Sequence, residues 1–377
     1  MTDARYTPLR SRHEALGASF TDFGGWQMPV RYTSDLAEHH AVRQAAGVFD
    51  ISHMAEFTIV GAQAGEYLDY VLAGRLSALA IGKAKYSLLL AEDGGIIDDV
   101  IVYRLKDDEY LIISNAGNRE FVAEALSARV DRFLSERSET KGEVAVTDVS
   151  DDYALIAVQG PQAEAIVSAI AGLDDVSVAW EEQKYYAWAS ATFAGKPVLV
   201  ARTGYTGEDG FELMVAAADA ESLWDAVLAA GEPLGLVPAG LAARDTLRLE
   251  AGMPLYGHEL NRQTKPAQAG LGRVVVTAKE RFVGKDAVEP AADAPVLIGL
   301  AAEGRRAGRA GYAIVLEDGT AVGEITSGAL SPTLGHPIAM AFVAPSYAAG
   351  ETPLFLDVRG TKIPATVTAL PFYRRTK

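Results

Sequence analysis

Two adjacent aspartates stand inside an apolar stretch that otherwise has the composition of a buried strand. Residues 94–103 read Gly-Gly-Ile-Ile-Asp-Asp-Val-Ile-Val-Tyr, and a run opened by a Gly-Gly turn and rich in Val and Ile is typical of a strand packed on both faces. Because strand side chains alternate, Asp99 shares one face with Ile101 and Tyr103, and Asp98 points to the other. A carboxylate buried there must find hydrogen-bond donors or lose its charge.

The flanking segments predict a three-stranded antiparallel meander. Residues 85–91 precede this strand through a Glu-Asp-Gly-Gly turn, and residues 110–116 follow it after a polar turn. On burial and period alone, an alternative is that the aspartate pair only accepts hydrogen bonds from turn amides near Gly95. If the acids instead serve a ligand, the meander can present to it a set of polar side chains from neighbouring strands: Tyr86, Asp99, Tyr103 and Asn115.

Composition excludes several classes of protein. A length of 377 residues predicts two or three domains at about 150 residues each. The net charge of −16 argues against nucleic acid as a partner, because phosphate contacts need a basic face. Cysteine is absent, which excludes disulfides, thiolate metal sites and a cysteine nucleophile. The six histidines are scattered without ligand spacing, so we expect no metal.

Hydropathy indicates a soluble chain outside the membrane. No apolar run approaches the roughly 20 residues of a membrane span, and the first residues lead into no apolar signal region. With the absence of cysteine, this pattern predicts an untargeted cytoplasmic protein.

The rest of the chain predicts alternating helices and strands followed by a β-rich tail. We expect a helix over 34–47, a strand over 151–160 with a helix over 162–170, and further helices after Asn118, Asp219 and Pro238. This alternation predicts an α+β fold. The aromatic stretch 20–30 is expected to be a loop. After about residue 290 the pattern predicts a small β-barrel or Greek-key domain, with strands near 296–301, 313–316, 321–326, 339–343, 354–358 and 365–370.

Glu212 and two arginines are further candidates for buried polar sites. Segments 198–203 and 211–215 predict a hairpin whose connection carries three glycines, but its spacing fits neither a dinucleotide fingerprint nor a P-loop. Glu212 is an acid inside the second strand. Arg244 and Arg248 lie four residues apart on a predicted helix, which usually indicates a solvated face, although Glu212 and Glu250 are possible buried partners. His53 is expected to be a satisfied structural histidine.

Several segments of the chain form a collinear set of motifs. These segments are 22–29 (Asp-Phe-Gly-Gly-Trp-Gln-Met-Pro), 49–54 (Phe-Asp-Ile-Ser-His-Met), 94–99, 202–212 (Arg-Thr-Gly-Tyr-Thr-Gly-Glu-Asp-Gly-Phe-Glu), 242–245, 326–328, 331–335 and 371–374 (Pro-Phe-Tyr-Arg). Through them the chain strongly resembles one family over nearly its whole length: the T protein of the glycine cleavage system, a tetrahydrofolate-dependent aminomethyltransferase.

This resemblance implies a three-domain cloverleaf around a central folate channel. One α+β domain would comprise residues 1–50 and 148–245, and a second, with the Asp99 meander, residues 51–147 and 246–280. Residues 281–377 would form the barrel. Carried over residue by residue, the catalytic acid is Asp99, and the folate-binding positions are Met54, Tyr86, Ile101, Tyr103, Ile113, Asn115, Tyr185, Tyr186, Glu212, Arg244 and Arg374.

The implied activity transfers a methylene carbon from the aminomethyl-dihydrolipoyl arm of lipoylated H protein to tetrahydrofolate. The products would be 5,10-methylenetetrahydrofolate and ammonia, and no metal is required. Two positions depart from the usual pattern: Gln268 stands where an acid is common, and Arg273 where Trp is typical. Because of these two departures, the resemblance does not define which residues line the implied channel near its mouth.

Three rival functions share this architecture. A folate-dependent demethylase remains an alternative. A sarcosine-type oxidase predicts an attached flavin domain, for which no G-x-G-x-x-G motif after an N-terminal strand is present. A non-enzymatic folate-binding protein of iron–sulfur cluster maintenance would carry a Cys-containing motif where this chain reads Arg-Phe-Val-Gly-Lys-Asp at 281–286.

Overall fold

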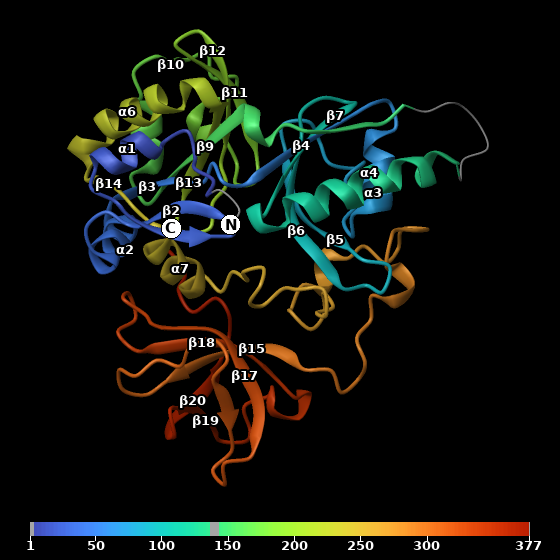
Figure 1. The fold of residues 1–377 in the computed structure, drawn as a ribbon, viewed down its shortest axis with the longest axis vertical. Coiled ribbons are helices and arrows are strands. Elements are labelled where there is room, and N and C mark those ends of the chain that lie inside the picture. Colours follow the sequence, from blue (N-terminus) through green and yellow to red (C-terminus); the bar gives the residue numbers. More distant parts are fainter. Residues whose placement is uncertain (1–3, 136–142, 377) are drawn as a thin grey trace. The chain divides into compact units, whose positions relative to one another are not determined.

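The computed structural model describes residues 4–135 and 143–376 and shows two compact units (Figure 1). The first unit comprises Met1–Ser87, Asp99–Gly204 and Glu208–Arg244, and the second comprises Leu88–Asp98, Tyr205–Gly207 and Asp245–Lys377. Each unit is therefore assembled from distant parts of the sequence. The boundaries of the three predicted domains stay a prediction.

A seven-stranded sheet forms the larger core of the first unit. Its order is β10-β11-β12-β13-β9-β3-β14, and all neighbours whose register is known are antiparallel except β14, which runs parallel to β3. Helix α6 (Ala220–Gly231) is labelled in Figure 1. It and α5 (Ala163–Ser168) pack against this sheet around buried Trp224. The strands are β3 (Ala46–Asp50), β9 (Tyr153–Gln159), β10 (Leu173–Asp174), β11 (Trp188–Phe193), β12 (Lys196–Ala201), β13 (Gly210–Ala216) and β14 (Leu236–Pro238).

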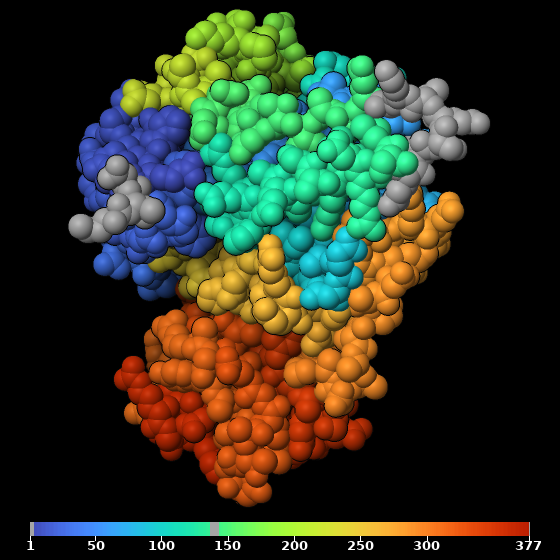
Figure 2. All heavy atoms as spheres, turned by 45° about the vertical axis from the view of Figure 1, so that its right-hand side comes forward, coloured from blue at the N-terminus to red at the C-terminus, as the bar shows by residue number. Residues whose placement is uncertain are grey.

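A five-stranded sheet, in the order β5-β6-β7-β4-β8, contains the predicted meander. Helices α3 (Ala64–Val71) and α4 (Arg119–Ser135) pack on it, and the outward side of α4 belongs to the teal surface in Figure 2. Ile101 pairs with Ile113, so the β6 face that carries Asp99 continues onto β7. The strands are β4 (Ala55–Val60), β5 (Ala84–Leu90), β6 (Ile96–Arg104), β7 (Glu109–Ser114) and β8 (Ala145–Asp148).

The second unit contains a closed barrel in the order β15-β18-β17-β16-β19-β20, which confirms the predicted β-rich tail. Its interior is apolar, with Leu300, Ile325 and Leu356 fully or almost fully buried. The strands are β15 (Val296–Ala302), β16 (Ala313–Val315), β17 (Ala321–Leu330), β18 (Pro337–Val343), β19 (Leu354–Val358) and β20 (Thr361–Thr368). Together with the two sheets, the barrel confirms the α+β class.

The N-terminal segment differs from the sequence prediction. The expected aromatic loop is a hairpin of β1 (Ser19–Phe23) and β2 (Trp26–Arg31), joined by two glycines with positive φ. Pro29 lies in β2, and proline in an edge strand weakens the strand signal. Ser34 caps α2 (Asp35–Gln44) through its hydroxyl, as predicted, but the helix ends before residue 47. Helix α1 spans Arg10–Ala15.

Helix α7 (Leu241–Glu250) corrects the expectation of a solvated arginine face. Arg248 is 1% exposed and donates to Asp245 and to Glu259 rather than to Glu212 or Glu250. Short 3-10 helices complete the chain: η1 (Ala116–Asn118), η2 (Ser150–Asp152), η3 (Trp180–Glu182), η4 (Ala217–Asp219), η5 (Glu232–Leu234), η6 (Gly272–Val274), η7 (Lys285–Ala287) and η8 (Pro345–Tyr347).

Candidate functional site

Asp99 lies on β6 and receives hydrogen bonds from both neighbouring strands. The Tyr86 hydroxyl of β5 donates to its Oδ2 at 3.1 Å, and Asn115, directly after β7, donates from Nδ2 to Oδ1 at 2.8 Å. Both donors are neutral. Burial raises the pKa of Asp99, and the two hydrogen bonds offset only part of this effect. The neighbouring strands of the meander therefore orient the Asp99 carboxyl group through neutral hydrogen-bond donors, without a cation among the described residues that would fix it as an anion.

The alternative role of Asp99 as a turn acceptor does not hold. The Gly95 amide donates to Asp93 Oδ1 at 2.9 Å, so the turn supplies its own acceptor. Asp98 is fully buried on the opposite face of β6. The predicted alternation of the two acids is thus present, and only Asp99 faces the Tyr86 and Asn115 donors.

Glu212 forms a second acidic centre on β13. Thr203, which follows β12, donates from Oγ1 to Glu212 Oε2 at 2.5 Å, and the Tyr103 hydroxyl lies 3.3 Å from the same Oγ1. Burial raises the pKa of Glu212, while the Thr203 hydrogen bond and the charge of Arg244 act in the opposite direction. Burial also raises the pKa of Tyr103, to which Glu212 contributes.

Sequence analysis missed Thr203. The threonine lies within the Arg-Thr-Gly-Tyr-Thr-Gly segment, in which the glycine spacing is the more prominent pattern. The available signal was a polar residue at the end of the predicted strand 198–203, beside a partner strand that carries an acid.

Tyr186 adjoins both acids. Its pKa is raised by burial first, and then by the charges of Tyr185, Glu212 and Asp99, so the two acidic centres share this neighbour. Its backbone adopts φ 58°, a conformation that costs a non-glycine residue about 1 to 3 kcal/mol. Hydrogen bonds from Tyr186 N to Arg202 O at 3.0 Å and from Ala84 N to Tyr186 O at 2.9 Å hold it there.

The other predicted positions surround these centres or lie apart from them. The Tyr185 ring contacts the Tyr186 ring edge-on at a centroid distance of 4.9 Å, and Tyr185 is 46% exposed. Ile101 and Ile113 form a cross-strand pair on the Asp99 face. Met54 lies in the turn before β4, and its amide donates to Ile51 O at 3.1 Å. Arg374 belongs to the second unit, in the segment after β20.

His53, beside Met54, is not the satisfied structural histidine that was expected. It is 3% exposed, and its Nδ1 has no hydrogen-bond partner among the described residues. Burial, with the charge of Arg244, lowers the pKa of His53 to about 4, so the ring is neutral at pH 7.

The two residues that depart from the usual family pattern lie in the second unit. Gln268 accepts from Lys265 N at 2.9 Å and donates to Pro295 O at 3.0 Å, so its amide serves local backbone groups. Arg273 lies in η6. Both residues therefore lie in the connecting segment between α7 and the barrel, for which no strand is assigned.

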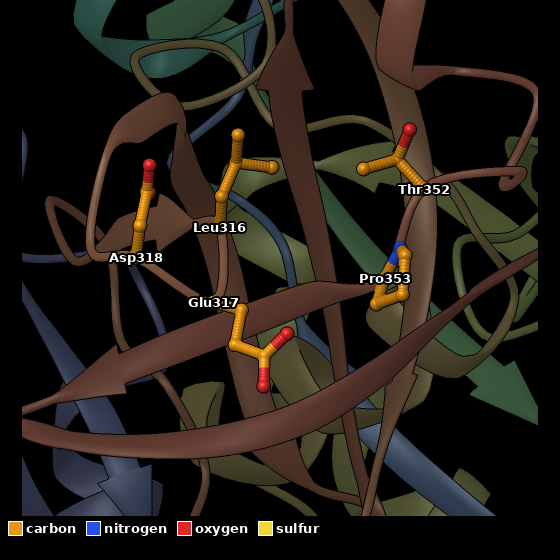
Figure 3. A pocket seen from close by; sticks show the side chains of 5 residues that line it. All are labelled: Leu316, Glu317, Asp318, Thr352 and Pro353. Carbon is orange, nitrogen blue, oxygen red and sulfur yellow. The ribbon is translucent and has the colours of Figure 1, made fainter.

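A pocket of about 510 Å³ opens on the barrel and lacks every predicted site residue (Figure 3). Its lining side chains include two carboxylates and no cation: Leu316, Glu317, Asp318, Thr352 and Pro353. Across residues 4–135 and 143–376, no cluster of His, Asp and Glu is arranged to hold a metal ion. In the same residues, no helix has the length and apolar character to cross a membrane.

Comparison with known proteins defines the class. The GCVT N-terminal domain family model matches residues 9–279, and the glycine cleavage T-protein C-terminal barrel domain model matches residues 296–374. The chain belongs to the glycine cleavage T-protein family of aminomethyltransferases. This confirms the resemblance seen in the motifs and identifies an enzyme of the transferase class.

Individual relatives agree over the full length. The chain is 56% identical to the aminomethyltransferase of Cutibacterium acnes and 52% identical to that of Saccharopolyspora erythraea, with 100% of both chains covered in each case. It also matches the crystal structure of glycine cleavage system aminomethyltransferase T from Bartonella henselae, with a TM-score of 0.88, 34% identity and complete coverage of both chains.

Proposed function

We propose that this aminomethyltransferase transfers the methylene carbon of an aminomethyl group, carried on the dihydrolipoyl arm of H protein, to tetrahydrofolate. The two folate nitrogens that receive the carbon lose one proton each. One proton completes ammonia and the other completes the carrier thiol, so that 5,10-methylenetetrahydrofolate, ammonia and the reduced carrier are formed. The lipoylated partner and a cytoplasmic location belong to the same proposal.

The observation that carries the proposal is the pair of neutral donors on Asp99. A group that must accept a folate N–H and stabilise positive charge developing at the transferred carbon needs a fixed position and an adjustable proton affinity. Tyr86 and Asn115 fix both oxygens of Asp99, and neither carries a charge. As a general acid–base, Asp99 would contribute about 100- to 10,000-fold to the rate.

The remaining predicted residues would bind the folate. The flat edge of a pterin ring presents N–H donors, for which a carboxylate such as Glu212 is a natural acceptor. Tyr185, Tyr186 and Met54 would supply flat or polarizable walls. Arg244 and Arg374 would pair with carbonyl or anionic groups of the ligand.

The test follows methylenetetrahydrofolate and ammonia together, with purified protein, tetrahydrofolate and aminomethylated H protein. We expect equal release of both products from the native enzyme and a loss of about 100- to 10,000-fold in Asp99→Asn. Tetrahydrofolate binding should survive this substitution. Asp93→Asn, in the exposed turn before the same strand, is the matched control and should retain full activity.

Two results would contradict the proposal. Tetrahydrofolate binding without either product would favour an accessory folate-binding protein, and 5-methyltetrahydrofolate formed from a methyl donor, without H protein, would favour a demethylase. Full activity of Asp99→Asn would remove Asp99 from the chemistry while leaving the transferase assignment intact.

A further inference from the structure

A chain of polar contacts runs from β9 through Thr203 to Glu212. We propose that Thr203 is a positioning residue, which holds one oxygen of the Glu212 carboxylate and so aims this carboxylate at the ligand. This inference rests on the proposed function, in which Glu212 accepts hydrogen bonds from the pterin.

The direction of the hydrogen bonds follows from the hydroxyl chemistry. Thr203 has one hydroxyl proton, and it donates that proton to Glu212 Oε2 at 2.5 Å. Its lone pairs are then left to accept from the Tyr103 hydroxyl at 3.3 Å. Tyr103 is 0% and Thr203 1% exposed, so water does not compete for these groups. Among the described residues, Thr203 fixes the Glu212 carboxylate at Oε2, and in this proposal Oε1 accepts from the ligand.

The backbone of Thr203 is itself held in place. Gln159, at the end of β9, is fully buried and donates from Nε2 to Thr203 O at 3.0 Å. A Cβ on Gly204 would lie 1.9 Å from Gln159 Oε1, and one on Gly210 would lie 2.3 Å from Gln159 Nε2. Both glycines therefore leave room for the Gln159 amide. This accounts for two of the glycines whose spacing matches no phosphate-binding motif.

Electrostatics gives the Thr203 hydroxyl a second effect. Burial raises the pKa of Glu212, which favours the neutral acid and would weaken its acceptance of pterin N–H groups. A short hydrogen bond from a hydroxyl stabilises the carboxylate form. Removing the hydroxyl should therefore both free the side chain to rotate and favour its protonation.

The first test compares Thr203→Val, which removes the hydroxyl at nearly constant volume, with Thr203→Ser, which keeps it. Tetrahydrofolate affinity is measured by calorimetry between pH 5 and 8, and KM and kcat are measured in the transfer assay. We expect Thr203→Val to weaken binding and raise KM about 10- to 100-fold. The change in kcat should be smaller. Thr203→Ser should stay within about threefold of the native protein.

The pH profile distinguishes positioning from a merely structural role. In the native protein, binding should weaken toward acid as Glu212 becomes protonated, and in Thr203→Val this limb should move to higher pH. In Glu212→Gln the limb should disappear, and adding Thr203→Val to it should cost little more. Thr192→Val is the matched control, because Thr192 donates to Asp175 at 3.0 Å on the exposed part of the same sheet; its affinity and profile should be native.

Several results would overturn the inference. Equal affinity and an unmoved pH limb in Thr203→Val would do so, as would equal losses in the Ser and Val variants. If Thr203→Val fails to fold, as judged by circular dichroism, Thr203→Ala removes the same hydroxyl without placing a methyl group against Glu212 and Tyr103. A native protein that does not bind tetrahydrofolate would instead contradict the proposed function, so the two failures are distinguishable.

Discussion

Three buried or half-buried acids of the first unit have two different kinds of partner. Asp50, at the end of β3, receives the Thr7 hydroxyl at 2.5 Å and the Ser52 amide at 2.9 Å, and His13 Nε2 lies 2.8 Å from its Oδ2. Among the described residues, the side chains that donate hydrogen bonds to Asp99 and to Glu212 are neutral, and Glu212 also feels the charge of Arg244. Burial works against the charge of all three.

The outcome for the pKa differs between the groups. Burial alone would raise the pKa of Asp50, but the hydrogen bond and charge of His13, helped by Thr7 and Ser52, lower it. The pKa values of Asp99 and Glu212 remain raised. An acid whose purpose is to join segments is thus stabilised as an anion, whereas the acids proposed to contact the ligand keep a proton affinity that can change during a reaction.

The largest expected effect on stability is that of Asp50→Asn. The substitution leaves His13 without an anionic partner and weakens the bonds that tie the N-terminal segment to β3, so we expect a loss of about 3 kcal/mol in the free energy of unfolding. Urea denaturation at pH 7 measures it. Glu14→Gln is the control, because Glu14 pairs with Arg10 on the surface of the same N-terminal region and should change stability by less than about 0.5 kcal/mol.

The pH dependence of this effect has a defined sign. Because the folded-state pKa of Asp50 is lowered from 3.8, its contribution is complete above that value and is lost as the pH falls below it. The difference in the free energy of unfolding between the native protein and Asp50→Asn should therefore shrink as the pH falls below 4. A gap that persists at low pH would show that the effect is steric.

Much of the Asp99 site could be predicted from the sequence, because its partners come from adjacent strands. Short turns fix the order of a meander, and alternation then places Tyr86 and Asn115 on the Asp99 face. Arg248 shows where this reasoning fails. Its partner Glu259 lies beyond the helix and its partner Ser327 lies in β17, and no local pattern encodes such distant pairing. The prediction of a loop around Pro29 was wrong for another reason, because a proline in an edge strand weakens the sequence pattern of that strand.

Glu56 sharpens the comparison, because it is a buried acid with neither kind of partner. It lies on β4, is 1% exposed, and its two carboxylate oxygens have no hydrogen-bond partner among the described residues. Burial raises the pKa of Glu56 well above 4.5, and the nearby charge of Arg119 offsets only part of this. Register places it opposite Ile113, on the sheet face of Asp99.

Glu56→Gln is expected to stabilise the protein by about 1 to 2 kcal/mol at pH 8. With a raised folded-state pKa, the native acid contributes fully only below its unfolded pKa, and that contribution is lost as the pH rises. In denaturation experiments, the difference in unfolding free energy between Glu56→Gln and the native protein should therefore decrease toward pH 4. Glu124→Gln, on the exposed side of α4, should give no such convergence. A destabilised Glu56→Gln at pH 8 would mean that Glu56 is held as an anion.

The smallest stability effect is expected for Asp99→Asn, although we expect the same substitution to remove most of the proposed activity. Asparagine can still offer an oxygen to Asn115 and an amide to the Tyr86 oxygen, and it removes the cost of burying a charge. We therefore expect unfolding free energies within about 1 kcal/mol of the native protein, with any change toward greater stability. Thermal and urea denaturation of the same samples used in the transfer assay measure this. A loss near that of Asp50→Asn would erase the distinction between the two groups, because Asp99 would then hold the meander together as Asp50 holds the N-terminal segment.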